Sequence, residues 1–233
     1  MATATCSAVA FRWARPSKHA DMTPPASACT VCQPTALEAL VRSEPALAAQ
    51  WQALPRRHFA ASAVLLRSGE TCTRAWLVES GLVRLYYLSD QGTERNRSFH
   101  MEGNWVGGGM PPLALPSPYT IEALEPVQAV ELGYATLQDW HHRFPHIQAL
   151  LNEAMGYLFT QHARRESDLL GLSPEARYRS FLADQGNLAE RLPQHHVASY
   201  LGISAVSLSR IRARLGMVAA PATPRLKVPV ATR

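Results

Sequence analysis

Short runs of β-branched and aromatic residues, separated by evenly spaced glycines, dominate the middle of the chain. The glycines stand 12, 11 and 11 residues apart, at Gly69, Gly81, Gly92 and Gly103. Turn glycines at this spacing are typical of an antiparallel β-roll or sandwich. The pattern therefore predicts a small roll that contains the run Leu82 to Tyr87, followed by a hairpin turn at Asp90-Gln91-Gly92.

Helical periodicity appears on both sides of the predicted roll. Apolar positions between Thr35 and Trp51 predict a short helix before the roll. After a last strand at Val127–Leu132, the pattern predicts a helix at Tyr134–Arg143 and a long helix from Pro145 to about Leu170. Proline suits the first helical position, because the N–H that it lacks would have no partner there.

The long helix carries an apolar seam with alternating spacings of four and three residues, formed by Ile147, Leu151, Ala154 and Leu158. Such a seam is able to pair with a second copy of itself, so it predicts a homodimer. The alternative is that this face packs on the roll of its own chain.

A second helical unit begins after Ser173-Pro174-Glu175, where the serine is placed to cap a new helix. Within it, Gln194 to Ile211 predicts two short helices joined by a tight turn. Such a helix-turn-helix needs a small residue at the contact, a residue tolerant of positive φ in the turn, and an apolar set on both inner faces. These requirements are met by Val197, Ala198, Leu201, Gly202, Ile203, Leu208 and Ile211. The alternative is an ordinary helical hairpin.

The second helix of this unit is expected to begin at Ala205, capped by Ser204, and to end near Leu215 with Gly216 as its stop. In a helix-turn-helix this helix enters the major groove of double-stranded DNA. Arg210 is the first choice for a base contact, because a guanidinium can bond both major-groove acceptors of guanine. The predicted DNA-binding residues are Gln194, His195, Ser204, Ser207, Ser209, Arg210, Arg212 and Arg214, of which Gln194, His195, Arg212 and Arg214 are expected at phosphates.

Charge supports this interpretation because it is concentrated at one end. The chain has a net charge of +5, and from Gly186 onward seven basic residues face the single acid Glu190. That segment therefore carries +6 and the first 185 residues carry −1. A basic end predicts contact with a polyanion, whereas a solvated basic tail is the alternative.

The composition also bears on membrane insertion, cellular location and disulfide content. No apolar run is long enough to span a bilayer, and Arg12, Trp13 and Arg15 interrupt the early apolar stretch, so we expect a cytoplasmic protein without a membrane partner. The true start could be Met1 or Met22. The four cysteines, Cys6, Cys29, Cys32 and Cys72, are too scattered for a disulfide scaffold. Neither a cofactor nor a catalytic residue is predicted.

The expected fold is α+β, with residues 1–33 as a flexible leader, 34–144 as the roll, 145–170 as a dimerisation helix, 171–217 as the helix-turn-helix domain and 218–233 as a basic tail. With these parts, the chain resembles the Crp/Fnr superfamily of bacterial transcription regulators. The resemblance is strongest at residues 69–87, 116–124 and 193–215. It implies a cyclic-nucleotide-binding-like jelly roll, a homodimer that reads palindromic DNA, a small-molecule effector, and RNA polymerase as a partner of an activator.

Three departures from the family pattern limit what the resemblance implies. Members that bind cyclic nucleotides use a glycine-glutamate step and an arginine-serine pair, where this chain has Gly107-Gly108-Gly109 and Ser117-Pro118. We therefore predict that cyclic AMP is not the effector. Ala205 and Val206 replace the arginine and glutamate that read the common half-site, although Val206 could meet a thymine methyl. Three prolines after Met217 leave the usual wing in doubt.

Other classes of function remain as alternatives. Oxygen-sensing members hold an iron–sulfur cluster on cysteines, and Cys29, Cys32 and Cys72 resemble that arrangement, which makes a redox-sensing regulator one alternative. A ligand-sensing module without DNA binding is a second. A metal-dependent cupin-type enzyme would need converging histidines. His58 and His100 are far apart in sequence, while His141, His142 and His146 follow the predicted roll.

Overall fold

The structure is a computed structural model that describes residues 44–217. The predicted leader, the first part of the helix expected from Thr35, the cysteines Cys6, Cys29 and Cys32, and the basic tail with any wing lie outside these residues. The strands are β1 Arg56–Phe59, β2 Val64–Leu66, β3 Thr71–Cys72, β4 Arg74–Ser80, β5 Val83–Leu88, β6 Glu94–His100, β7 Trp105–Gly107, β8 Leu115–Pro116, β9 Thr120–Ala123 and β10 Val127–Gly133. The helices are α2 Pro45–Gln52, α3 Tyr134–Arg143, α4 Pro145–Gly171, α5 Pro174–Arg191, α6 Gln194–Leu201 and α7 Ala205–Arg214.

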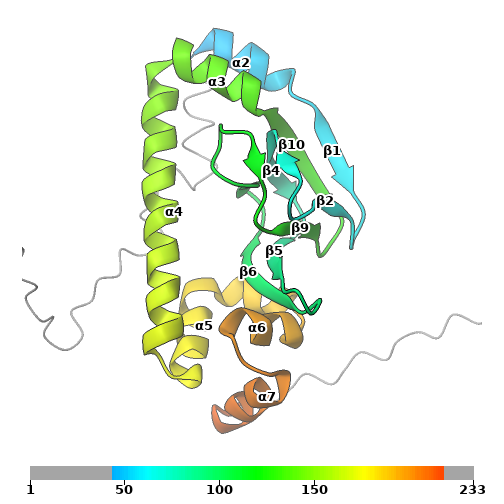
Figure 1. The fold of residues 1–233 in the computed structure, drawn as a ribbon, viewed down its shortest axis with the longest axis vertical. Helices are drawn as coiled ribbons and strands as arrows, with labels where there is room; N and C mark the ends of the chain where they lie inside the picture. The colour runs from blue at the N-terminus through cyan, green and yellow to red at the C-terminus, as the bar shows by residue number, and fades with distance from the viewer. Residues whose placement is uncertain (1–43, 218–233) are drawn as a thin grey trace, which may run out of the picture.

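The strands form the predicted antiparallel roll (Figure 1). One sheet has the order β1-β10-β4-β7 and the other has the order β2-β9-β5-β6, while β3 and β8 form a small third pair. The inner faces bury one core, which includes Trp76, Val83, Leu85, Ile121 and Ala129.

The predicted turn glycines adopt the left-handed conformation that favours glycine. Gly81 has φ 98°, and a Cβ at this position would lie 2.3 Å from the carbonyl oxygen of Pro126. Only a glycine fits this crossing of two chain segments without a backbone shift. The hairpin between β5 and β6 turns at residues 89–93, where the backbone N–H of Gly92 donates to Ser89 at 2.9 Å. The predicted hairpin is therefore confirmed.

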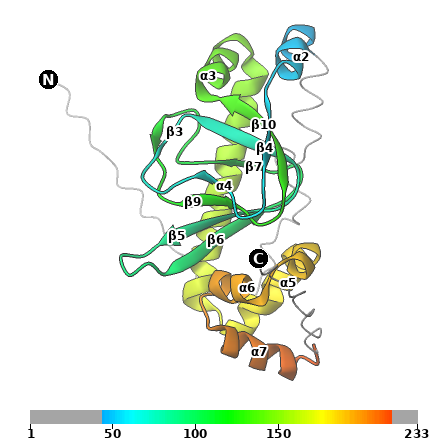
Figure 2. The same cartoon turned by 90° about the vertical axis from the view of Figure 1, so that its right-hand side faces the viewer.

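Helices α2 and α3 cover one end of the roll, and α4 runs from there along its side (Figures 1 and 2). A second core joins these helices to the roll, and its buried members are Leu47, Leu132, Leu137, Trp140 and Ile147. The bounds of α3 match the prediction, and α4 ends one residue beyond it. None of the helices within residues 44–217 has the length and apolar character that crossing a membrane requires.

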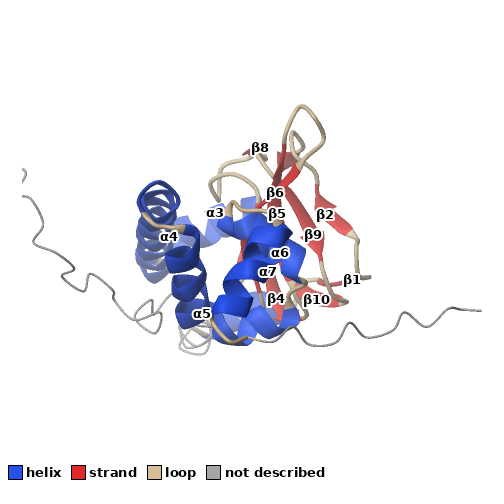
Figure 3. Ribbon diagram, turned by 90° about the horizontal axis from the view of Figure 1, so that it is seen from below, coloured by secondary structure: helices blue, strands red, loops and turns tan. Residues whose placement is uncertain are grey.

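Helices α5, α6 and α7 gather at the far end of α4, beneath the β5–β6 hairpin (Figures 2 and 3). Ser173 caps α5 as predicted, because its Oγ accepts a hydrogen bond from the backbone N–H of Ala176 at 3.2 Å. A third core unites these helices with two residues of the roll, Leu82 and Phe99. The helical unit is consequently packed on the roll by shared apolar contacts rather than held only by the connection to α4.

Candidate nucleic-acid interface

Helices α6 and α7 are joined by the tight turn that the sequence predicts. Gly202 ends α6 with φ 70° and ψ 30°, the left-handed conformation of a helix C-cap. The backbone N–H of Ile203 then donates to the carbonyl oxygen of Ala198 at 3.0 Å. This bond turns the chain between the end of α6 at Leu201 and the start of α7 at Ala205.

The apolar set predicted for this unit is buried between the two helices and α5. The fully buried members are Val197, Ala198, Leu201, Leu208 and Ile211, and Ile203 packs against them while partly exposed. Tyr178, Phe181 and Leu188 of α5 complete the same core. Because the core uses the inner faces of both helices, the opposite face of α7 is fixed in direction.

Ser204 caps α7, as predicted. Its Oγ accepts a hydrogen bond from the backbone N–H of Ser207 at 3.1 Å, and the two hydroxyl groups lie 2.9 Å apart. The cap satisfies one of the backbone donors that would otherwise have no partner at a helix start. The first turn of α7 is thereby ordered where a helix-turn-helix meets the bases.

The outer face of α7 is polar and uncovered. Ala205, Val206, Ser207, Ser209 and Arg210 are all exposed, with Val206 at 61%. Within residues 44–217, the guanidinium of Arg210 has no hydrogen bond or ion pair. Helix α7 lies at the end of the molecule farthest from α2 and α3, with no other described element beyond it (Figure 1). This face is thus free to meet a large ligand.

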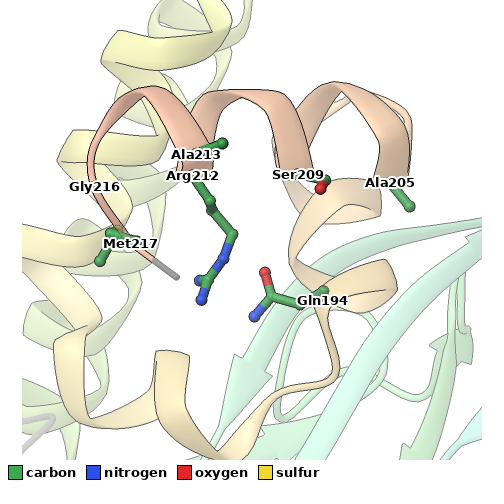
Figure 4. Close-up of a pocket in the computed structure, with 7 residues that line it drawn as sticks. All are labelled: Gln194, Ala205, Ser209, Arg212, Ala213, Gly216 and Met217. Atoms are coloured by element: carbon green, nitrogen blue, oxygen red, sulfur yellow. The ribbon is translucent and has the colours of Figure 1, made fainter. Parts of the chain in front are cut away.

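Arg212 does not lie where the sequence interpretation expected it. Its Nη1 donates to the hydroxyl of Tyr178 at 2.7 Å, and the side chain is partly buried between α7 and α5. Figure 4 shows it turned toward Gln194 across a pocket of about 400 Å³ that also borders Ser209 and Met217. Through this hydrogen bond Arg212 links α5 and α7, and its predicted contact with a phosphate stays a prediction.

The other predicted phosphate ligands lie around this outer face. Arg214 is exposed and forms an ion pair with Glu175 of α5 at 3.3 Å, which contributes little stability because Arg214 is well solvated and Glu175 is partly exposed. Gln194 and His195 are exposed at the start of α6. The fold therefore brings Gln194 close to the end of α7, although the two lie about twenty residues apart in sequence.

The roll positions that correspond to the nucleotide site are filled by the protein itself. A Cβ at Gly108 would lie 2.6 Å from Leu66, 2.8 Å from Ser117 and 2.9 Å from Cys72. Ser117 is buried, and its hydroxyl donates to the carbonyl oxygen of Tyr119 at 2.6 Å. Leu66, Cys72 and Ser117 therefore lie directly against the backbone at Gly108.

Cys72 lies inside the roll, where its thiol has three polar contacts. Its thiol donates to the carbonyl oxygen of Arg74 at 3.0 Å, accepts from the backbone N–H of Gly108 at 3.1 Å and lies 3.4 Å from the hydroxyl of Tyr134. This burial opposes the iron–sulfur alternative, because a cluster ligand at Cys72 would have to leave the core. Histidines do not converge either: within residues 44–217, no group of three metal-binding side chains lies close enough to hold an ion.

The predicted dimerisation seam is only partly at the surface. Ile147 is 2% exposed and packs with Leu47 and Trp140 of its own chain, and Leu151 borders the same core. For this end of α4 the prediction of a dimer contact is therefore wrong, because α2 and α3 cover the seam. Ala154 is partly buried and Leu158 is exposed.

A different apolar stripe is exposed on the second half of α4. Phe159 and Leu170 are 76% and 82% exposed, and Ala163 stands between them on the same face. This stripe lies about 130° around the helix from the predicted seam. Phe159, Ala163 and Leu170 are spaced by four and seven residues, a pattern that the sequence shows. The sequence favours the earlier seam because its spacings of four and three residues are more regular.

Comparisons with known proteins agree with this architecture. The cyclic nucleotide-binding domain family matches residues 56–143. The transcriptional activator protein Anr of Pseudomonas protegens is 26% identical over 164 residues, which cover 64% of this chain and 66% of that protein. The fumarate and nitrate reduction regulatory protein of Escherichia coli K12 is 25% identical over 182 residues, covering 66% of this chain and 67% of that one.

Solved structures share the fold. The c-di-GMP responsive global regulator CLP of Xanthomonas campestris superposes with a TM-score of 0.62 at 18% identity, covering 74% of this chain and 91% of that one. FixK2 of Bradyrhizobium japonicum gives a TM-score of 0.59 at 20% identity, covering 70% and 84%. Residues 56–143 are thus similar to the cyclic nucleotide-binding domain, the chain is similar in sequence to these two regulators, and it shares the fold of the solved structures.

Proposed function

We propose that this protein is a homodimeric, sequence-specific DNA-binding regulator of transcription that acts in the cytoplasm and has no enzymatic activity. One observation carries the proposal: the polar face of α7 is uncovered, whereas its apolar face is buried and its first turn is capped. A helix fixed in this way has the geometry that enters a major groove. The relatives named as transcription regulators support the same function.

Arg210 is assigned to a base edge. It lies on the exposed face of α7, and its five donors have no partner within the described residues. A guanidinium that is free of internal partners keeps its fork available for the O6 and N7 acceptors of guanine. Val206, one turn earlier, offers an exposed methyl pair to a thymine methyl, and Ser207 offers a hydroxyl.

Phosphate contacts are assigned to Gln194, His195 and Arg214, which are exposed at the edges of the same face. Such contacts fix the position of a protein on the duplex and add affinity that falls with salt concentration, but they carry no sequence information. Arg212 is left out of this set because its guanidinium donates to Tyr178.

Pairing of two chains is assigned to the stripe of Phe159, Ala163 and Leu170 on α4. Exposed aromatic and aliphatic side chains on one helical face are stabilised by burial against a second copy. Leu158, exposed beside the stripe, stays a predicted contact. We expect Phe159→Glu to raise the dimer dissociation constant at least about tenfold in sedimentation, while Leu88→Glu on the roll leaves it unchanged.

The roll is proposed to respond to a ligand other than cyclic AMP, or to none. The positions of the nucleotide site contain glycines and a buried serine, and Leu66 and Cys72 fill the space beside them. We expect titration with cyclic AMP to leave both the thermal midpoint and the DNA affinity unchanged. A saturable shift of either would overturn this part of the proposal.

The proposal is tested by selecting bound sequences from random duplexes with the full chain and with Arg210→Ala. We expect a two-fold-symmetric site whose preference at one position of each half-site relaxes by about 1–3 kcal/mol in the variant. Arg143→Ala, which removes an exposed arginine from α3, is the matched control and should keep the preference. If no symmetric site is enriched, the chain is instead a ligand-sensing module without DNA binding.

A further inference from the structure

A buried arginine lies where the helix-turn-helix unit meets the roll. Arg84 belongs to β5 and points to the outer face of its sheet, because its neighbours Val83 and Leu85 fill the inner core. An outer face of an antiparallel sheet is commonly solvated. Arg84 is nevertheless only 6% exposed, because α6 covers this part of the sheet (Figure 2).

The charge of Arg84 is balanced within the roll. Its Nη2 lies 2.6 Å from the carboxylate of Glu122 on β9, and its Nη1 lies 2.7 Å from that of Glu94 on β6. The guanidinium also packs 4.2 Å from the ring centre of Tyr86. A buried cation with two carboxylate partners is satisfied electrostatically, and these contacts hold its fork in one orientation.

Helix α6 docks on this cluster through its own polar groups. Nδ1 of His196 lies 3.5 Å from Nη1 of Arg84 and 3.1 Å from the side-chain nitrogen of Asn96, which also donates to the His196 carbonyl oxygen at 3.0 Å. The backbone N–H of Asn96 donates to Oγ of Ser199 at 3.0 Å. Every one of these bonds joins the roll to α6.

The chemistry of His196 makes this junction sensitive to protons. Two donors, from Arg84 and Asn96, face its Nδ1, so this nitrogen serves as an acceptor and must be unprotonated. The charged groups around it are Arg84 on β5, Glu94 on β6, Glu122 on β9 behind Arg84, and the adjacent His195 of α6. A proton on Nδ1 would face both donors and break both bonds.

We propose that Arg84, Asn96 and His196 form a proton-sensitive latch that holds α6, and with it α7, on the β-roll. The effect of the latch on DNA binding rests on the proposed function, whereas the latch itself does not. The latch fixes α7 relative to α4, and therefore fixes the spacing of two α7 helices if two α4 helices pair. A two-fold reader needs such fixed spacing, so the docked form is the one that binds DNA.

The pKa of docked His196 is lowered to about 4, mainly by burial and also by the charges of Arg84 and His195, while Glu94 opposes them. Because the docked histidine holds its proton less tightly than a solvated one, docking is favoured when His196 is neutral. Docking is therefore complete above the ordinary pKa of 6.5 and weakens as the pH falls from there toward 4.

The latch is tested without DNA by hydrogen–deuterium exchange of the β6 peptide that contains the Asn96 amide. After correction for the intrinsic pH dependence of exchange, we expect protection to fall about three- to tenfold between about pH 7.5 and about pH 5.5. In His196→Gln the amide oxygen can accept in place of Nδ1 but cannot gain a charge, so this fall should disappear. His58→Gln, which replaces an exposed histidine of β1, should keep it.

A fall in protection that persists in His196→Gln, or no fall in the unmodified chain, would overturn the latch. Affinity for the selected duplex gives the second readout: we expect it to decrease with pH over the same range in the unmodified chain and to stay level in His196→Gln. An affinity that instead rises as protection falls would show that the docked form is the inactive one. If no form binds DNA, the proposed function fails while the exchange result still decides the latch.

Discussion

The two helices of the helix-turn-helix differ in where their polar side chains point. Helix α6 directs His196 and Ser199 toward the roll, where they bond to Asn96 and cover Arg84. Helix α7 directs Ser207 and Arg210 outward, away from every described element. Both helices bury apolar residues in one core, so the difference lies only in what covers the remaining face.

This difference separates positioning from recognition. His196 and Ser199 of α6 form hydrogen bonds within the protein, so a change in them alters where α7 is held. The guanidinium of Arg210 on α7 has no partner within residues 44–217, so a change in it leaves the fold intact and alters what α7 can bind. Variants of His196 or Ser199 should therefore change how firmly α6 and α7 are held on the roll, whereas variants of Arg210 should change DNA binding alone.

The largest effect is expected from the shared core. Leu208→Ala removes a fully buried side chain between α6, α7 and α5 and should lower the free energy of unfolding by about 2–5 kcal/mol in urea titrations. Val206→Ala, two residues earlier on the same helix, is the control and should change stability by less than about 0.5 kcal/mol. Equal losses in the two variants would contradict the assignment of the inner and outer faces.

The next effect concerns recognition. Arg210→Lys keeps the positive charge but loses the planar fork, so we expect affinity for the selected site to fall by about 1–3 kcal/mol. Affinity for an unrelated duplex should stay the same, because the charge is retained. Competition binding against both duplexes measures the ratio, and a parallel loss on both would remove Arg210 from base recognition.

A smaller effect is expected from the cap of α7. Ser204→Ala removes the acceptor for the backbone N–H of Ser207 and should destabilise α7 by about 1 kcal/mol. The thermal midpoint and amide exchange in the first turn of α7 are the measurements. Ser209→Ala removes an exposed serine from the middle of the same helix and should have no such effect. If both variants behave alike, the hydroxyl of Ser204 is not the cap.

The smallest effect separates two arginines that share one carboxylate. Arg214 and Arg179 both form ion pairs with Glu175. We expect Arg214→Ala to weaken binding to all duplexes alike and to reduce the slope of log affinity against log salt by about 0.9, while Arg179→Ala leaves the slope unchanged. Unfolding should hardly change in either variant, because exposed pairs contribute little. The same slope for both variants would remove Arg214 from the phosphate contacts.

Features that depend on neighbours in sequence were predicted from the sequence. The proline at the start of α4, the serine caps of α5 and α7 and the left-handed Gly202 each follow from local backbone chemistry. The β-prone run that forms β5 and the periodicity of α3 follow in the same way. These features were sufficient to predict the roll, the long helix and the two short helices.

Features that depend on distant segments were not predicted. Ile147 has the spacing of a dimer contact, but α2 and α3 cover it because they pack at the same end of the roll. Arg212 has the spacing of an exposed residue, but Tyr178 of α5 lies within hydrogen-bond distance. Arg84 sits in an ordinary β-strand pattern, and only α6, more than a hundred residues later, buries it.

The central claim is that α7, rather than the roll, lies against the duplex. Its most direct test places a photoreactive residue at Val206 in one variant and at Leu88, which is 56% exposed on β5, in another. After irradiation with the selected duplex, we expect covalent protein–DNA product from position 206 and none above background from position 88. Product from position 88 alone, or none from position 206 while the complex is intact, would contradict the claim.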